Sequence, residues 1–161
     1  MNLSWLFDRM LETADRPALV WRDEVVTYAD LLSARYDWDA TLTEHGVHTG
    51  EVVAIVGDYS PASCAAMLAL IDRGAIVVPL TDATAAQHDE FLALSEAQHV
   101  IRLRDDGTGA AETWSIERLG TEVSHPLLRQ LADTQRSGLV VFSSGSTGAS
   151  KGMVHDLDRT L

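Results

Sequence analysis

The chain has 161 residues, of which 46% are hydrophobic and 22% are charged, and its formal net charge at pH 7 is −12. This length and this balance predict one globular domain with a hydrophobic core. The acidic charge argues against general binding to nucleic acid or to anionic membranes, which attract basic surfaces, but a single small anion can still be held locally.

The cysteine count and the N-terminus bear on the compartment. One cysteine, Cys64, excludes an internal disulfide and fits a reducing environment. The stretch MNLSWLFDRM lacks a basic region, and Asp8 and Arg9 interrupt its apolar residues, so it is not typical of a signal peptide. No apolar run approaches the roughly 18 residues of a membrane span. We therefore expect a cytoplasmic protein without a membrane span.

The N-terminal third predicts a helix, a hairpin and a second helix. Apolar residues at helical spacing favour a helix over 3–13, and two short strands then surround a tight turn at 22–24. Thr27 and Asp30 have the spacing of a capping box, so a helix should begin directly after Thr27. Gly46 is a natural end for that helix.

The next segment predicts a strand, a helix and a strand. Residues 52–57 and 75–80 are apolar runs rich in valine and isoleucine, which is typical of strands covered on both faces. Between them Ser60 is a suitable N-cap, Pro61 fits the first helical position, and Gly74 fits the helix end. The expected arrangement is a parallel pair joined by a right-handed crossover.

The remainder continues this alternation. Thr84 and Gln87 have the spacing of another capping box. The expected elements are a helix at 85–95, a strand at 99–103, a polar loop at 104–113, a helix at 124–135 and a buried strand at 138–142. The whole chain therefore predicts one α/β layered domain with a mostly parallel sheet flanked by helices.

The strand at 138–142 leads into SSGSTGASKG, which includes the only lysine of the chain. A glycine-rich turn after a strand presents several backbone N–H groups to one point and so binds phosphate; glycine allows close approach and positive φ. Hydroxyl groups and the ammonium group of Lys151 add donors and charge. The candidate ligands are Ser143, Ser144, Gly145, Ser146, Thr147, Gly148, Lys151 and Gly152.

Two other interpretations of this stretch were weighed. The Walker motif requires Gly-Lys-Ser/Thr, whereas Ser150 precedes Lys151 and Gly152 follows it. A flexible linker also has this composition. A linker, however, has no reason to follow directly on a buried strand, so phosphate binding is favoured.

The same ten residues resemble the phosphate-loop signature of the adenylate-forming superfamily, which contains acyl- and aryl-CoA synthetases, luciferases and adenylation domains of peptide synthetases. All eight candidate ligands fall on that pattern. Ser150 replaces the commonest residue, proline, while His155 stands where histidine is frequent and Leu157 where many members have a second one. The stretches ALVWRDEVVTYADLL and LIDRGAIVVPLTDATAAQ also resemble the family, so the likeness covers essentially the whole chain.

The resemblance implies a function and a place within a larger fold. Residues 1–161 would be part of an N-terminal AMP-binding domain, without the C-terminal domain, the adenine pocket and the catalytic lysine that follow the phosphate loop in the family. The implied reaction activates a carboxylic acid with ATP, with Mg²⁺ bound through the phosphates, and passes the acyl group to a thiol, for which CoA is favoured. Lys151 would neutralise charge on pyrophosphate, and residues 1–161 alone are expected to be inactive.

Alternatives remain open at this point. The chain could be a free-standing phosphate- or nucleotide-binding module, or a structural half that needs a second polypeptide. An edge left uncovered beside the strand at 138–142 would favour self-association. No metal ligands are expected, because His45 and His48 sit at a helix end and in a loop without a third ligand nearby.

Overall fold

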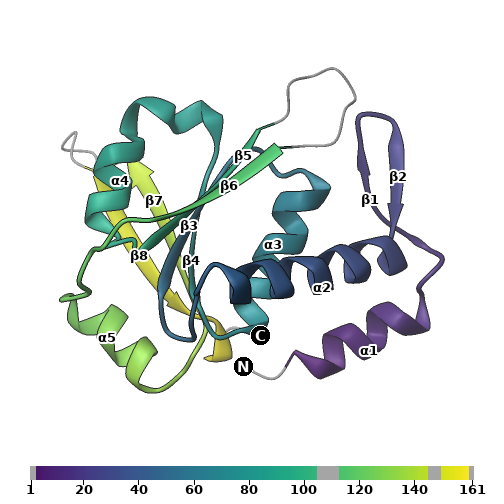
Figure 1. Ribbon diagram of the computed structural model, residues 1–161, viewed down its shortest axis with the longest axis horizontal. Helices are drawn as coiled ribbons and strands as arrows, with labels where there is room; N and C mark the ends of the chain where they lie inside the picture. Colours follow the sequence, from purple (N-terminus) through teal and green to yellow (C-terminus); the bar gives the residue numbers. More distant parts are fainter. Residues whose placement is uncertain (1–2, 105–112, 145–149, 160–161) are drawn as a thin grey trace.

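The computed structural model describes residues 3–104, 113–144 and 150–159, and Figure 1 shows their arrangement. The elements are, in chain order, α1 (Ser4–Glu12), β1 (Pro17–Trp21), β2 (Glu24–Thr27), α2 (Tyr28–Glu44), β3 (Val52–Val56), α3 (Pro61–Asp72), β4 (Ile76–Leu80), the 3-10 helix η1 (Asp82–Gln87), α4 (His88–Leu94), β5 (His99–Arg104), β6 (Thr113–Arg118), α5 (Pro126–Asp133), β7 (Gly138–Ser144), β8 (Ser150–Asp156) and the 3-10 helix η2 (Leu157–Arg159).

A six-stranded sheet with the order β6-β5-β3-β4-β7-β8 forms the centre. The four inner strands are parallel, whereas β6 and β8 pair antiparallel with β5 and β7. All five residues of β3 are buried, as expected for a strand covered on both faces. The predicted fold class, a mostly parallel sheet flanked by helices, is confirmed.

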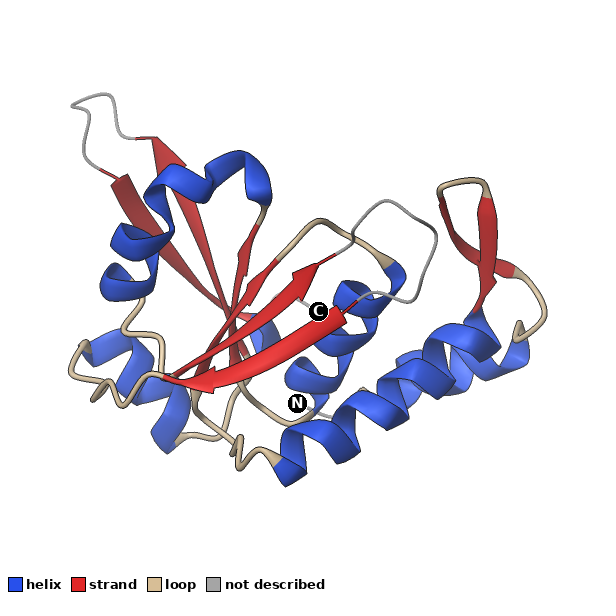
Figure 2. Cartoon of the chain, turned by 45° about the horizontal axis from the view of Figure 1, so that its top comes forward, coloured by secondary structure: helices blue, strands red, loops and turns tan. Residues whose placement is uncertain are grey.

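Helices cover both faces of this sheet, as Figures 1 and 2 show. On one face, α2 and α3 enclose an apolar cluster that includes Leu42, Val53 and Leu70. On the other face, α4 and α5 enclose a second cluster that includes Phe91 and Leu128. The hairpin β1-β2 is a separate two-stranded sheet that lies beyond the N-terminal end of α2 (Figure 1).

Several predicted helix boundaries are confirmed. At the start of α2, Thr27 and Asp30 form both hydrogen bonds of the capping box. The Ser60 side chain accepts a hydrogen bond from the backbone N–H of Ser63, and Pro61 opens α3. Gly74, after the end of α3, has a φ of 79°, a conformation that favours glycine.

The predicted capping box at Thr84 and Gln87 is wrong. Thr84 lies inside η1, where its hydroxyl donates to the carbonyl of Thr81 at 2.9 Å, and α4 begins only at His88. The segment leaving β4 therefore tightens into a 3-10 turn before the α-helix starts. The expected helix at 85–95 is correspondingly shorter, and it ends at Leu94.

Two strands were missed. The sequence at β6 has no buried face, since five of its six residues are exposed. β8 occupies residues that the composition predicts as a loop. β8 pairs with β7 over the full length of β7, whereas β4 pairs with the other side of β7 only at Gly138 and Leu139. β7 is therefore an inner strand of the sheet. In the described part of the chain the outer strands are β6 and β8, and self-association stays a prediction.

Within 3–104, 113–144 and 150–159, no helix is both long enough and apolar enough to cross a bilayer.

Candidate functional site

The candidate site lies at the carboxyl end of the parallel strands. β3 leads through α3 to β4 on one side, and β4 leads through α4 to β5 on the other side of β3. The two helices pack against opposite faces of the sheet. In sheets of this kind a ligand-binding crevice forms outside the carboxyl ends of the strands where the connections diverge.

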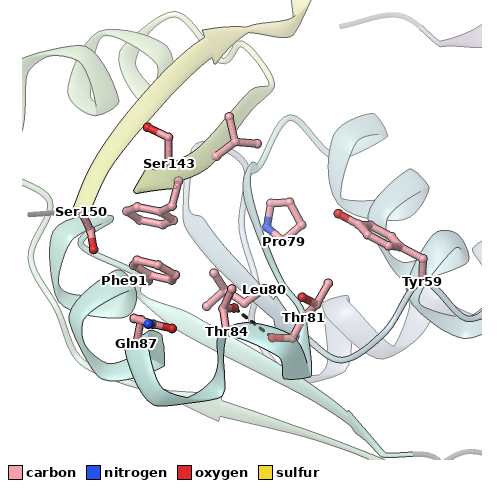
Figure 3. A pocket seen from close by; sticks show the side chains of 11 residues that line it. Tyr59, Pro79, Leu80, Thr81, Thr84, Gln87, Phe91, Ser143 and Ser150 are labelled. Carbon is pink, nitrogen blue, oxygen red and sulfur yellow. Dashed lines mark hydrogen bonds between the residues drawn. The ribbon is translucent and has the colours of Figure 1, made fainter. Parts of the chain in front are cut away.

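A pocket of about 420 Å³ opens at this position. It is lined by Tyr59 after β3, Thr81 and Thr84 after β4, and Ser143 and Ser150 from β7 and β8. Figure 3 shows Ser143 and Ser150 on one side of the pocket and Tyr59 on the other. The pocket therefore lies at the meeting point of three strand ends and has hydroxyl groups along its rim.

Two of the predicted ligands face each other across the β7-β8 pair. Ser143 is the register partner of Lys151, and both are exposed. Side chains of directly opposed strand residues share one face of a sheet, with Cβ atoms about 5 Å apart. A hydroxyl donor and a positive charge are thus placed next to each other at the end of β7, which suits an anionic ligand such as a phosphate.

Of the other predicted ligands in the loop, only Ser144 is among the described residues. The backbone of Ser144 pairs with Ser150 at the last described rung of the β7-β8 ladder. Gly145, Ser146, Thr147 and Gly148 lie outside the described residues.

Gly152 differs from the expectation. It lies within β8 opposite Phe142, and it is not among the glycines with positive φ. A Cβ atom there would lie 3.2 Å from Cε1 of Phe142, so this glycine leaves room for an aromatic ring. Gly152 therefore does not use the positive φ that glycine allows, and a side chain there would crowd the ring of Phe142.

An aromatic pair beside the site was missed by the sequence analysis. The rings of Phe91 on α4 and Phe142 on β7 are stacked, with centroids 4.1 Å apart and planes 7° apart. Both residues line the pocket. The two positions are remote in sequence, so no local pattern indicates that they meet.

Two residues compared with the family pattern lie near the end of β8. His155 is exposed on β8, in register with Leu139. Leu157, which stands where many members have a second histidine, is buried in η2. The side chain of Leu157 is thus shielded from solvent by packing.

Other chemically active residues lie outside this site. His45 closes α2, with Nδ1 2.9 Å from the carbonyl oxygen of Thr41 and its ring edge-on to Trp114. Burial raises the pKa of the Cys64 thiol, which disfavours the reactive thiolate. Among the residues with described positions, no three His, Cys, Asp or Glu side chains group as a metal site.

The chain is similar to known proteins in sequence and in structure. The sequence profile of the family described as "AMP-binding enzyme" matches residues 6–161. Surfactin synthase subunit 2 of Bacillus subtilis is 30% identical over an alignment of 143 residues, and the match covers 85% of this chain and 4% of that protein. Pyochelin synthetase PchE of Pseudomonas aeruginosa is 31% identical over an alignment of 150 residues, and the match covers 91% of this chain and 10% of that protein. The chain thus spans a small part of these relatives.

Solved structures share the fold. The N-terminal subdomain of Klebsiella oxytoca NpsA superposes with a TM-score of 0.68 at 26% identity and covers 94% of this chain and 41% of that one. The same subdomain in complex with 3-hydroxybenzoyl-AMSN gives a TM-score of 0.66 at 25% identity. The profile match over residues 6–161 and the shared fold show that the chain belongs to the AMP-binding enzyme family.

Proposed function

We propose that this chain forms the phosphate-binding part of a unit that activates a carboxylic acid with ATP. The observation that carries the proposal is the pairing of Ser143 with Lys151 beside a pocket at the carboxyl end of the parallel strands. Family membership over residues 6–161 supports ATP, with Mg²⁺ bound through its phosphates, as the substrate of this site.

The residues suit one step of this chemistry. A carboxylate oxygen of the acid attacks the α-phosphate of ATP, the bond from the α-phosphorus to the bridging oxygen breaks, and pyrophosphate leaves with that oxygen. The ammonium group of Lys151 offsets charge on the leaving pyrophosphate, and the hydroxyl of Ser143 donates a hydrogen bond to it. Mg²⁺ would supply further charge neutralisation through the same phosphates.

The remaining proposed ligands are Ser144, Gly145, Ser146, Thr147, Gly148 and Gly152, which the motif pattern assigns to the β- and γ-phosphates. Groups for the adenine, the ribose and the acid would come from segments outside residues 1–161. We therefore expect residues 1–161 alone to show no adenylation.

The acyl acceptor is proposed to be the thiol of a phosphopantetheine carrier protein. The resemblance in sequence favours CoA, but the similar proteins include surfactin synthase, pyochelin synthetase and a PKS-NRPS hybrid synthetase. Peptide synthetases transfer activated acids to carrier proteins, so these relatives support a carrier thiol over CoA. The acid that this unit activates would be selected by residues beyond the phosphate site.

Carboxylate-dependent exchange of pyrophosphate into ATP tests the proposal in the full-length protein. A panel of amino acids and aryl acids serves as substrates, and the Lys151→Ala variant is compared with Arg129→Ala, which removes an exposed charge from α5. We expect Lys151→Ala to lower exchange about 100-fold, because one charge-assisted contact to the transition state is lost. Arg129→Ala should keep wild-type exchange. Equal activity of the two variants would contradict the proposed role of Lys151.

The acceptor is tested separately with the activated acid. Transfer to a holo carrier protein, to the same carrier without phosphopantetheine, and to CoA is compared at equal concentrations. We expect acylation of the holo carrier only. Acyl-CoA as the main product would contradict the proposed acceptor and leave the adenylation proposal intact.

A further inference from the structure

We propose that Phe91 is a positioning residue for the phosphate site. Its ring holds the ring of Phe142 in place, and Phe142 in turn packs against Gly152, which has no side chain. This inference rests on the proposed function and deepens it, because Phe91 lies on α4, far in sequence from the phosphate motif. It assigns a role in ATP binding to a side chain that has no polar group.

The first observation is the contact between the two rings. Phe91 is 7% exposed, and its ring lies parallel to that of Phe142 at a centroid distance of 4.1 Å. Phe142 directly precedes Ser143 in β7. Because a strand side chain stands roughly perpendicular to the sheet, a ring held by packing restrains the backbone of Phe142, from which the chain continues to Ser143.

The second observation is the fit of Phe142 against β8. Phe142 and Gly152 are register partners, and a Cβ atom at Gly152 would lie 3.2 Å from Cε1 of Phe142 and 3.6 Å from Cγ1 of Val140. The ring thus uses the space that a side chain at Gly152 would fill. The next rung of the ladder is Ser143 opposite Lys151, whose side chains project from the other face of the same two strands. The ring therefore packs one residue away from the two proposed phosphate ligands.

The third observation is that Phe91 is itself anchored to the sheet. One turn before it, Nε2 of His88 lies 3.0 Å from the carbonyl oxygen of Thr81, which directly follows β4. The hydroxyl of Thr84 donates to the same carbonyl at 2.9 Å, as the dashed line in Figure 3 shows. The start of α4 is therefore hydrogen-bonded to the end of β4. The stacking of Phe91 on Phe142 links this part of the fold to β7.

Phe91 also belongs to the apolar cluster under α4 and α5, so its replacement lowers stability whether or not it positions the site. The two roles differ in what they do to ATP binding. A residue that only fills the core changes the melting temperature and leaves the KM for ATP unchanged. A positioning residue raises the KM for ATP, while kcat at saturating ATP stays close to that of the wild type.

The test measures exchange kinetics and thermal melting of the full-length protein. Phe91→Leu removes the ring, Phe91→Tyr keeps it, and Leu128→Ala, on α5 in the same cluster, is the matched core control. We expect Phe91→Leu to raise the KM for ATP about five- to tenfold with kcat within about twofold, and Phe91→Tyr to restore it. Leu128→Ala should lower the melting temperature with a KM for ATP within about twofold of wild type.

A double-mutant cycle covers the case in which Phe91→Leu does not fold. Gly152→Ala should raise the KM for ATP, and Phe142→Leu in that background should recover part of the loss, because the smaller side chain relieves the contact. A KM unchanged in Phe91→Leu, or raised equally in Leu128→Ala, would overturn the inference, as would a cycle without coupling. A wild-type protein that shows no acid-dependent exchange would instead remove the proposed function and this inference with it.

Discussion

The two faces of the sheet are held together by different interactions. On the side of α2 and α3, two arginines join the helices. The buried Arg35 of α2 pairs with Asp72 of α3, and the partly buried Arg73 donates to Asp39 and to the carbonyl oxygen of Val47. On the side of α4 and α5 the contacts are mainly aliphatic and aromatic. The proposed phosphate site adjoins the second side through the stacked pair of Phe91 and Phe142.

The residues on one face contribute to stability alone, whereas some residues on the other face also line the pocket. Ion pairs with low exposure fix the orientation of α2 against α3, but their side chains lie away from the pocket. The stacked rings on the other side contribute to the core and line the pocket as well. We therefore expect variants on the α2-α3 side to change stability alone, whereas variants around Phe91 change both stability and ATP binding.

The largest effect on stability is expected from Arg35→Ala. The Arg35 side chain is 10% exposed and its guanidinium also lies over the ring of Phe7 at 4.7 Å, so its removal leaves Asp72 without this partner. Removal of one member of a buried pair costs about 3–5 kcal/mol, and the lower end applies because Asp72 is 27% exposed. Urea unfolding measures this loss, and the KM for ATP should stay at the wild-type value.

Arg9→Ala is the control for that variant. Arg9 and Glu12 form an ion pair on α1 whose side chains are 73% and 62% exposed. Because solvent screens such a pair, its loss should change the free energy of unfolding by less than about 0.5 kcal/mol. If both arginine variants lost the same stability, the assigned importance of the buried pair would be wrong.

A smaller loss is expected from Gly138→Ala, at the start of β7. A Cβ atom there would lie 2.7 Å from Cδ1 of Leu131 and 3.1 Å from Cγ2 of Ile76, so the core must shift. Overpacking of this kind costs about 1–3 kcal/mol. Thermal unfolding should show the loss, and adding Leu131→Val should recover part of it. A KM for ATP within about twofold of wild type would show that the clash does not reach the far end of the strand.

The smallest effect concerns Glu96, which links the end of α4 to the segment before α5. Its carboxylate accepts hydrogen bonds from the backbone N–H groups of Ser124 and His125 at 2.7 and 2.9 Å. The hydrogen bond from the Ser124 side chain is the main cause that lowers the pKa of Glu96 below the model-compound value of 4.5. A lowered folded-state pKa means that this stabilisation is present above the unfolded-state pKa and is lost as the pH falls through the folded-state pKa.

Urea midpoints measured from pH 7 down to pH 3 check this linkage. Ser124→Ala should lower the free energy of unfolding at pH 7 by about 0.5 kcal/mol, because solvent screens the partly exposed Glu96, and should flatten the acid dependence. Glu122→Gln, which changes an exposed carboxylate on the same loop, should retain the wild-type profile. A Ser124→Ala profile that is parallel to wild type across the acid range would contradict the assigned cause.

Much of the fold follows from the sequence alone, because its signals are local. The capping residues Thr27 and Ser60 act on N–H groups within three residues, and β3 is a continuous apolar run that both faces of a sheet must cover. Phosphate binding by the serine- and glycine-rich stretch is likewise predicted from the residue types of that stretch alone. The alternation of apolar strand patterns with helix patterns was enough to predict the fold class that the structure confirms.

Only the tertiary structure decides the edge strands and the support of the site. β6 and β8 have mostly exposed side chains, so no hydrophobic pattern in the sequence predicts them. They form strands because the neighbouring strand offers unpaired backbone N–H and C=O groups. Gly152 and Phe91 acquire their proposed roles in the same way. Each depends on where the ring of Phe142 lies, and that position is set by the register of β7 with β8 and by the packing of α4, which are long-range contacts that local sequence does not encode.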